Sequence, residues 1–145
     1  AIPSRAIGIE ITETALIDAQ PEIDTRLRIL RDLGYSIAID DFGTGYSSLL
    51  YLRRYSADTL KIDRAFVSGL GVSRDDTAIV SSLRGLAAML ELRVVAEGVE
   101  TQDQLQALRA MGCESASGYL LARPADASVI TQLLDEPLEL IRSHS

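Results

Sequence analysis

Apolar and polar residues alternate along the chain in short stretches that are typical of strands. The pattern occurs at residues 7–12, 36–40, 58–62 and 93–97. Because successive side chains of a strand point to opposite faces, each stretch has one apolar face, which we expect to pack against helices. The other faces carry a charged residue near their carboxyl ends, namely Glu10, Asp40, Lys61 and Glu97.

Helical spacing of apolar residues separates these stretches. Helices are predicted after Pro21, after Asp75 or Asp76, after Thr101 and after Pro124. We expect the aspartates to cap the second of these helices, Thr101 with Gln104 to form a capping box, and Gly34 to end the first. Strands that alternate with helices favour a parallel sheet with helices packed outside it.

The positions of the charged residues favour a β/α barrel over a doubly wound sheet. Four successive strands place a charge on the face opposite the helices. In a barrel these side chains converge at the carboxyl-terminal mouth, where barrel enzymes hold their active sites. We therefore predict an α/β fold of the TIM-like barrel type, with about four to five parallel strands and flanking helices.

The predicted mouth is rich in carboxylates. Beyond the strand residues, it holds Glu13, Asp41, Asp63 and Glu100. Uncompensated, such a cluster would be strongly destabilising. Mg²⁺ or Mn²⁺ with oxygen ligands is the simplest compensation. Two such ions, roughly 3.5–4 Å apart, stabilise an in-line phosphoryl displacement. Lys61 would then orient the attacking water or neutralise phosphate charge, and the sequence predicts phosphoryl chemistry.

The net charge, the apolar runs and the cysteine count of the chain limit the classes of partner that we expect it to bind. The net charge of -7 over 145 residues argues against binding to a nucleic acid polymer or to an anionic membrane surface. No run of 18 apolar residues is present, so we expect no membrane contact from this segment. The single Cys113 cannot form an internal disulfide, which suits a reducing cytoplasm.

Each charged residue also has an ordinary structural interpretation. The Asp40–Asp41 pair is compatible with a helix cap, and Lys61 with a solvated or ion-paired lysine. Glu97 and Glu100 are compatible with an exposed turn. These interpretations are independent, whereas a shared site explains the inward charge on four strands at once. The pattern therefore favours a functional site.

Five motifs, in order, resemble those of the EAL-domain cyclic di-GMP phosphodiesterases. They are I-E-I-T-E-T (9–14), D-D-F-G-T-G-Y-S-S-L (40–49), L-K-I-D (60–63), V-A-E-G-V-E-T (95–101) and G-Y-L-L-A-R-P (118–124). The resemblance implies a modified TIM-like barrel that hydrolyses one phosphodiester bond of cyclic di-GMP. The product would be linear pGpG, and the cofactor Mg²⁺ or Mn²⁺.

The resemblance also implies a role for individual residues. Glu10 and Asp41 match metal ligands, and Asp40 matches the ligand that two metals share. Lys61 matches the lysine that contacts the nucleophilic water, and Glu97 matches a glutamate at the metal and water site. Glu13 matches the glutamate that braces the D-D-F-G-T-G loop. The resemblance also implies a homodimer contact through residues 42–48 of this loop. Asp63, Glu100 and Ser117 are further candidates near the substrate.

Two departures from the family pattern qualify these expectations. The Glu-Ala-Leu motif that gives the family its name is absent. In the family its glutamate binds metal, and both this glutamate and an asparagine ligand lie upstream of the residue that Glu10 matches. A complete barrel needs about 250 residues. We therefore expect residues 1–145 to be the C-terminal part of one domain. We expect this chain to have little or no phosphodiesterase activity when it is isolated. The sequence does not say whether sensory or cyclase domains precede it. Ser117 stands where the family has glutamine, and lacks the reach of an amide.

Three alternatives stay open at this point. One is a degenerate domain that binds cyclic di-GMP as a sensor, or a protein partner, without cleavage. Another is a barrel enzyme that uses Lys61 as a Schiff-base nucleophile, which flanking carboxylates disfavour by raising the lysine pKa. The third is a structural half-barrel that dimerises through residues 43–48.

Overall fold

The computed structural model describes residues 2–17, 21–43, 52, 54–55 and 57–135, and its centre is a parallel sheet. The strands are β1 (Gly8–Thr12), β2 (Ser36–Phe42), β3 (Thr59–Ile62), β4 (Arg93–Ala96) and β5 (Ser115–Ala116). They lie side by side in chain order, β1-β2-β3-β4-β5, and every neighbouring pair is parallel. This arrangement confirms the predicted α/β fold. The two-residue strand β5 adds to the four stretches that the alternation pattern predicted.

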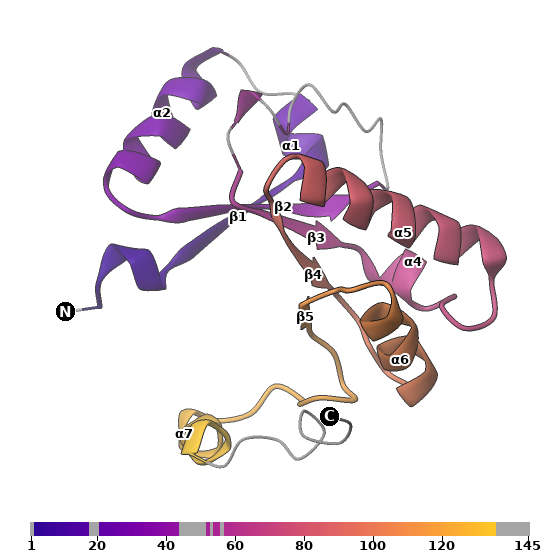
Figure 1. The fold of residues 1–145 in the computed structure, drawn as a ribbon. Helices are drawn as coiled ribbons and strands as arrows, with labels where there is room; N and C mark the ends of the chain where they lie inside the picture. The colour runs from indigo at the N-terminus through magenta and orange to yellow at the C-terminus, as the bar shows by residue number, and fades with distance from the viewer. Residues whose placement is uncertain (1, 18–20, 44–51, 53, 56, 136–145) are drawn as a thin grey trace.

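Helices lie before, between and after the strands. The 3-10 turn η1 (Ser4–Ala6) precedes β1, and α7 (Ala127–Asp135) follows β5. The connecting helices are α1 (Glu13–Ile17), α2 (Pro21–Asp32), α4 (Arg64–Val67), α5 (Arg74–Met89) and α6 (Gln102–Ala110). In Figure 1, α2, α5 and α6 lie along one side of the sheet, and α7 lies apart from them beyond β5. No helix among the described residues has the length and apolar character needed to cross a membrane.

The apolar faces of β2, β3 and β4 form the core, as predicted, whereas Ile7 is 39% exposed and Ile9 and Ile11 are only half-buried, because β1 is the edge strand of the sheet. Ile37, Ile39, Leu60 and Ile62 are at most 1% exposed. Ile39 lies opposite Leu60 in the register of β2 and β3, so the buried side chains of neighbouring strands pack in rows. Burial of this apolar surface is the main term that holds the sheet against its helices.

Helix caps follow the sequence with one correction. Thr101 and Gln104 form the predicted capping box at α6, and Gly34 follows α2 at φ +89°. At α5, however, the N-cap is Ser73 and not an aspartate. The Ser73 hydroxyl accepts a hydrogen bond from the Asp76 amide at 3.1 Å, because extended backbone at Ser73 aims the hydroxyl at that amide. Asp75 and Asp76 lie in the first turn, where their negative charges interact favourably with the positive end of the helix dipole.

Candidate functional site

The charged residues of four strands meet around Lys61. Its ammonium nitrogen lies 2.7 Å from Glu10 Oε2, 2.8 Å from Glu97 Oε1 and 3.2 Å from Asp40 Oδ1. Glu10 belongs to β1, Asp40 to β2 and Lys61 to β3, and Glu97 follows β4. The Lys61 side chain is 10% exposed, whereas that of Glu10 is 54% exposed, so the cluster opens to solvent on the β1 side. The expected convergence at the carboxyl ends is thus observed.

A β-bulge explains why two aspartates are adjacent. Ile39 lies opposite Leu60 and Phe42 opposite Ile62, so Asp40 and Asp41 together face only Lys61. The extra residue shifts the alternation, and Phe42 returns to the core at 2% exposure. Asp41 takes up the bulge at φ +54°, a conformation that aspartate tolerates better than most residues. Its amide donates to Asp40 Oδ1 at 3.0 Å.

The electrostatics of the site keep the lysine charged. Desolvation lowers the pKa of Lys61, but hydrogen bonds from its ammonium to Glu10, Glu97 and Asp40 outweigh it and raise the pKa above its ordinary value. Desolvation also raises the pKa of Asp41, and the neighbouring Asp40 and Asp63 add to that rise against the opposing charge of Lys61. A lysine whose charged form is favoured by three carboxylates is a poor Schiff-base nucleophile, so this geometry argues against that alternative.

The Lys61 ammonium is the countercharge that the structure shows for the carboxylates. Within the described part of the chain, no three acidic, histidine or cysteine side chains are arranged to hold a metal ion. The structure therefore shows one compensating charge from the chain itself, an ammonium that contacts three of the carboxylates, and the divalent ion stays a prediction. The donor chemistry still suits a hard divalent ion, since Glu10, Asp40 and Asp41 offer carboxylate oxygens.

Glu13, the first residue of α1, contacts the backbone just after the end of β2. Its side chain is 3% exposed, and Oε2 accepts a hydrogen bond from the Gly43 amide at 3.0 Å. Gly43 adopts φ +97°, which favours glycine. The contact joins the start of α1 to the residue after β2. The remainder of the predicted dimer loop, residues 44–48, lies outside the described residues.

We expect Glu13→Ala to loosen this loop start. The substitution removes the acceptor of a part-buried amide, which costs about 1–3 kcal/mol of unfolding free energy. Glu13→Gln keeps an acceptor oxygen and is the matched control. Amide hydrogen exchange at Gly43 measures the effect: it accelerates in Glu13→Ala and stays near wild type in Glu13→Gln. Equal exchange in both variants would show that the Glu13 contact does not hold Gly43.

A hollow of about 380 Å³ adjoins the cluster and collects the remaining candidates. It is lined by Asp41, Asp63, Arg64, Glu97, Gly98, Glu100, Ser117, Gly118 and Tyr119. Asp63 also caps α4 by accepting from the Ala65 amide at 2.8 Å, and the Glu100 amide donates to Gln104 Oε1 at 2.8 Å. Sequence reasoning missed Arg64, Gly98 and Tyr119. Arg64 directly follows the candidate Asp63, Gly98 directly follows Glu97, and Tyr119 lies two residues after Ser117.

Close backbone packing forms one wall of this hollow. A Cβ on Gly118 would lie 2.2 Å from the Val99 amide nitrogen and 2.3 Å from its carbonyl oxygen. The Val99 amide donates to the Ser117 carbonyl, and the Leu120 amide donates to the Val99 carbonyl, each at 3.0 Å. Only a residue without a side chain allows this approach. Gly118 therefore fixes the chain that carries Ser117 and Tyr119.

Gly118→Ala is expected to destabilise the protein by about 2–4 kcal/mol, because the methyl group would force the two backbone segments apart. Gly85→Ala is a matched control: a Cβ there meets no atom within 4 Å. Gly85 lies within α5, and its replacement by alanine is expected to stabilise by up to about 1 kcal/mol. Urea denaturation measures both. A Gly118→Ala midpoint equal to wild type would contradict the packing argument.

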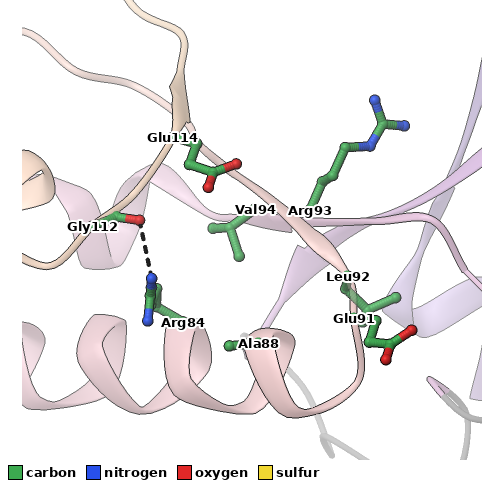
Figure 2. A pocket seen from close by; sticks show the side chains of 8 residues that line it. All are labelled: Arg84, Ala88, Glu91, Leu92, Arg93, Val94, Gly112 and Glu114. Atoms are coloured by element: carbon green, nitrogen blue, oxygen red, sulfur yellow. Dashed lines mark hydrogen bonds between the residues drawn. The ribbon is translucent and has the colours of Figure 1, made fainter.

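A second hollow, of about 180 Å³, lies at the opposite ends of the strands. Figure 2 shows Arg84 reaching from α5 to the Gly112 carbonyl, to which it donates a hydrogen bond at 3.4 Å, while Arg93 points away from that bond. Arg93 begins β4, whereas Glu97 follows its end. This hollow is thus separate from the carboxylate cluster.

Comparison with known proteins gives one family. The EAL domain model matches residues 1–124. The chain is 51% identical over 126 residues to the bifunctional diguanylate cyclase/cyclic di-GMP phosphodiesterase MucR of Pseudomonas aeruginosa, covering 86% of this chain and 18% of that protein. It is 42% identical over 123 residues to the cyclic di-GMP phosphodiesterase PdeB of Shewanella oneidensis, covering 85% of this chain and 14% of that protein. The chain thus spans about a fifth or less of these relatives.

Solved structures give the same result. The EAL domain of Mycobacterium smegmatis DcpA has a TM-score of 0.87 at 42% identity, over 93% of this chain and 60% of that chain. The manganese/cy-diGMP complex of Klebsiella pneumoniae BlrP1 has a TM-score of 0.81 at 37% identity, over 86% of this chain and 32% of that one. The motifs, the parallel sheet and the family match agree, and the chain belongs to the EAL domain family.

Proposed function

We propose that this chain supplies the Lys61-centred half of a cyclic di-GMP phosphodiesterase site. The observation that carries the proposal is the meeting of one ammonium with carboxylates from three other strand ends. Relatives named as cyclic di-GMP phosphodiesterases, and a structural neighbour described as a manganese/cy-diGMP complex, support the substrate and the need for a divalent ion.

In this proposal Glu10, Asp40 and Asp41 hold divalent ions, either Mg²⁺ or Mn²⁺. A bound ion would stabilise negative charge on the phosphoryl oxygens and make water a better nucleophile. Lys61 positions that water by donating a hydrogen bond. Because the ammonium donates to three carboxylates, Lys61 acts as a hydrogen-bond donor in this proposal, and a carboxylate of the cluster accepts the proton that the water loses. Glu97, 2.8 Å from the ammonium, helps to orient Lys61.

The remaining candidates act on the substrate or on the loop. Asp63, Glu100 and Ser117 line the hollow beside the cluster, where they would face the substrate. Glu13 would brace the loop after Asp41 through Gly43. We further propose that residues 42–48 form a homodimer contact and that the site works in the cytoplasm, which suits the single Cys113.

We also propose that residues 1–145 are the C-terminal part of a single EAL domain. The chain covers 60% of the solved DcpA chain and 52% of the solved MucR phosphodiesterase chain, so upstream residues would complete the barrel. An incomplete ligand set should bind metal weakly and misplace the water. The isolated chain is therefore expected to be inactive or weak.

Product chromatography tests this function. This chain and the same chain with its upstream EAL residues, here called the extended protein, are incubated with cyclic di-GMP and Mg²⁺, Mn²⁺ or EDTA. We expect pGpG from the extended protein with metal, none with EDTA, and little or none from the isolated chain. Absence of pGpG from the extended protein under every condition would overturn the proposal.

A sensor is the second candidate, and Ser117 favours it. The residue lines the hollow. The resemblance to the family implies that a longer glutamine is usual at this position. A sensor would bind cyclic di-GMP without making pGpG. Calorimetric binding beside the product assay separates the two, and cleavage gained by Ser117→Gln would identify this position as the cause.

A further inference from the structure

We propose that Gln104 is a positioning residue that fixes the spacing between the two chain segments that line the hollow beside the Lys61 cluster. These segments are residues 63–68, which follow β3, and residues 97–101, which follow β4. The inference rests on the proposed phosphodiesterase function. It adds a residue that sets how tightly cyclic di-GMP binds without touching it.

The Gln104 side chain is buried and uses both ends of its amide group. The residue is 7% exposed, although it belongs to the first turn of α6. Its Oε1 accepts hydrogen bonds from the Glu100 amide at 2.8 Å and the Thr101 amide at 3.0 Å. Its Nε2 donates to the Ser68 carbonyl at 3.3 Å, at the end of α4. One side chain therefore joins the segment after β4 to the segment after β3.

The capping box of α6 does not by itself require a glutamine. A glutamate at this position would accept the same amides, and its charge would interact favourably with the helix dipole. An ionised glutamate cannot donate, however, so the Ser68 carbonyl would face a carboxylate. A neutral amide accepts at one end and donates at the other, and this is the arrangement that the bridge to Ser68 needs.

The two segments also meet at the other end of α4. The Glu97 amide donates to the Ile62 carbonyl at 3.0 Å, and a Cβ on Gly98 would overlap the Arg64 side chain. Helix α4 is thus held by Gly98 at its first residue and by Gln104 at its C-cap. Strands β3 and β4 each have a neighbour on both sides in the sheet, so these contacts lie away from its edges.

Loss of the bridge should change the hollow and leave the reacting groups in place. Both segments supply residues that line the hollow, Asp63 and Arg64 from one, Gly98 and Glu100 from the other. Lys61 lies within β3, where the pairing of the strands fixes it independently of Gln104. A shift of α4 against the loop after β4 should therefore weaken substrate binding more than it slows the chemical step.

Steady-state kinetics and calorimetry of the extended protein test the bridge. Gln104→Glu keeps the acceptor of the capping box and loses the donor to Ser68. We expect it to raise KM and Kd for cyclic di-GMP about tenfold, with kcat within about threefold of wild type. Gln106→Glu makes the same change at an exposed residue of α6 and should leave KM within about twofold of wild type. An unchanged KM in Gln104→Glu would overturn the inference.

A second variant and a second substrate separate the bridge from a purely structural role. Gln104→Ala introduces no buried charge and removes both cap and bridge, so KM should rise at least as much and the urea midpoint should fall. A rise in Gln104→Ala without one in Gln104→Glu would make Gln104 a cap only. Hydrolysis of bis(p-nitrophenyl) phosphate, which carries no nucleobase, should change less than about twofold in either variant. An equal loss on both substrates would also overturn the inference.

The two proposals fail in different ways. If pGpG forms and both Gln104 variants leave KM and Kd unchanged, the bridge is wrong and the phosphodiesterase stands. If cyclic di-GMP binds more weakly to Gln104→Glu than to Gln106→Glu but neither protein cleaves it, the bridge stands and the phosphodiesterase is wrong. No binding of cyclic di-GMP to the wild-type extended protein overturns both.

Discussion

Asp40→Asn is expected to lower kcat for cyclic di-GMP hydrolysis by the extended protein by about 10³-fold or more. Asp40 is the carboxylate that faces Lys61 from within the β2 bulge, with Oδ1 3.2 Å from the ammonium. The substitution keeps the shape of the side chain and removes its charge. If Asp40 holds divalent ions, it supports several kcal/mol of transition-state charge stabilisation, which corresponds to this loss of rate.

Product chromatography over a range of Mn²⁺ concentrations measures the loss. Asp75→Asn is the matched control, because Asp75 is an exposed aspartate in the first turn of α5, away from the cluster. Excess Mn²⁺ should restore little of the lost rate. An Asp40→Asn protein that keeps more than a tenth of the wild-type kcat would remove Asp40 from the catalytic machinery.

Lys61→Met should have two large effects, one on rate and one on stability. The rate should fall by about 10²–10³-fold, because the donor that positions the water is lost. The metal-free protein should lose about 1–3 kcal/mol of unfolding free energy, since three carboxylates are left without their ammonium. Partial exposure of these carboxylates keeps the loss below that of a fully buried pair.

Thermal unfolding with and without Mn²⁺ separates the two effects. Mn²⁺ should raise the Tm of Lys61→Met more than that of wild type, because metal charge would replace ammonium charge. Lys61→Arg keeps the charge and should recover stability more than rate. Equal Mn²⁺-induced shifts in wild type and Lys61→Met would mean that metal and lysine do not share the same carboxylates.

Period-two alternation was sufficient to predict the four longer strands and the buried apolar faces of β2, β3 and β4, although the apolar face of the edge strand β1 is only half-buried. A strand such as Arg93–Ala96 places Val94 and Ala96 inside by alternation alone, and both are buried. The same rule placed Glu10, Asp40, Lys61 and Glu97 on one face, and they meet there. Strand β5 has two residues, too few for any period to be visible.

Local sequence could not predict features that depend on partner backbone. The letters D-D-F do not say which residue is extra in a bulge, because that depends on the register between β2 and β3. The sequence suggested an aspartate cap for α5, but the extended conformation of Ser73 decided the cap. The close contact of Gly118 with Val99 likewise depends on residues distant in the chain.

We propose that the carboxylates around Lys61 bind the divalent ions of a phosphodiesterase. Electron paramagnetic resonance during a Mn²⁺ titration of the extended protein, with Asp40→Asn beside it, detects these ions at the site. We predict two bound Mn²⁺ per wild-type domain with the spectrum of a coupled pair, and loss of the coupling in Asp40→Asn. Binding that is absent from wild type, or identical in the two proteins, would contradict the account.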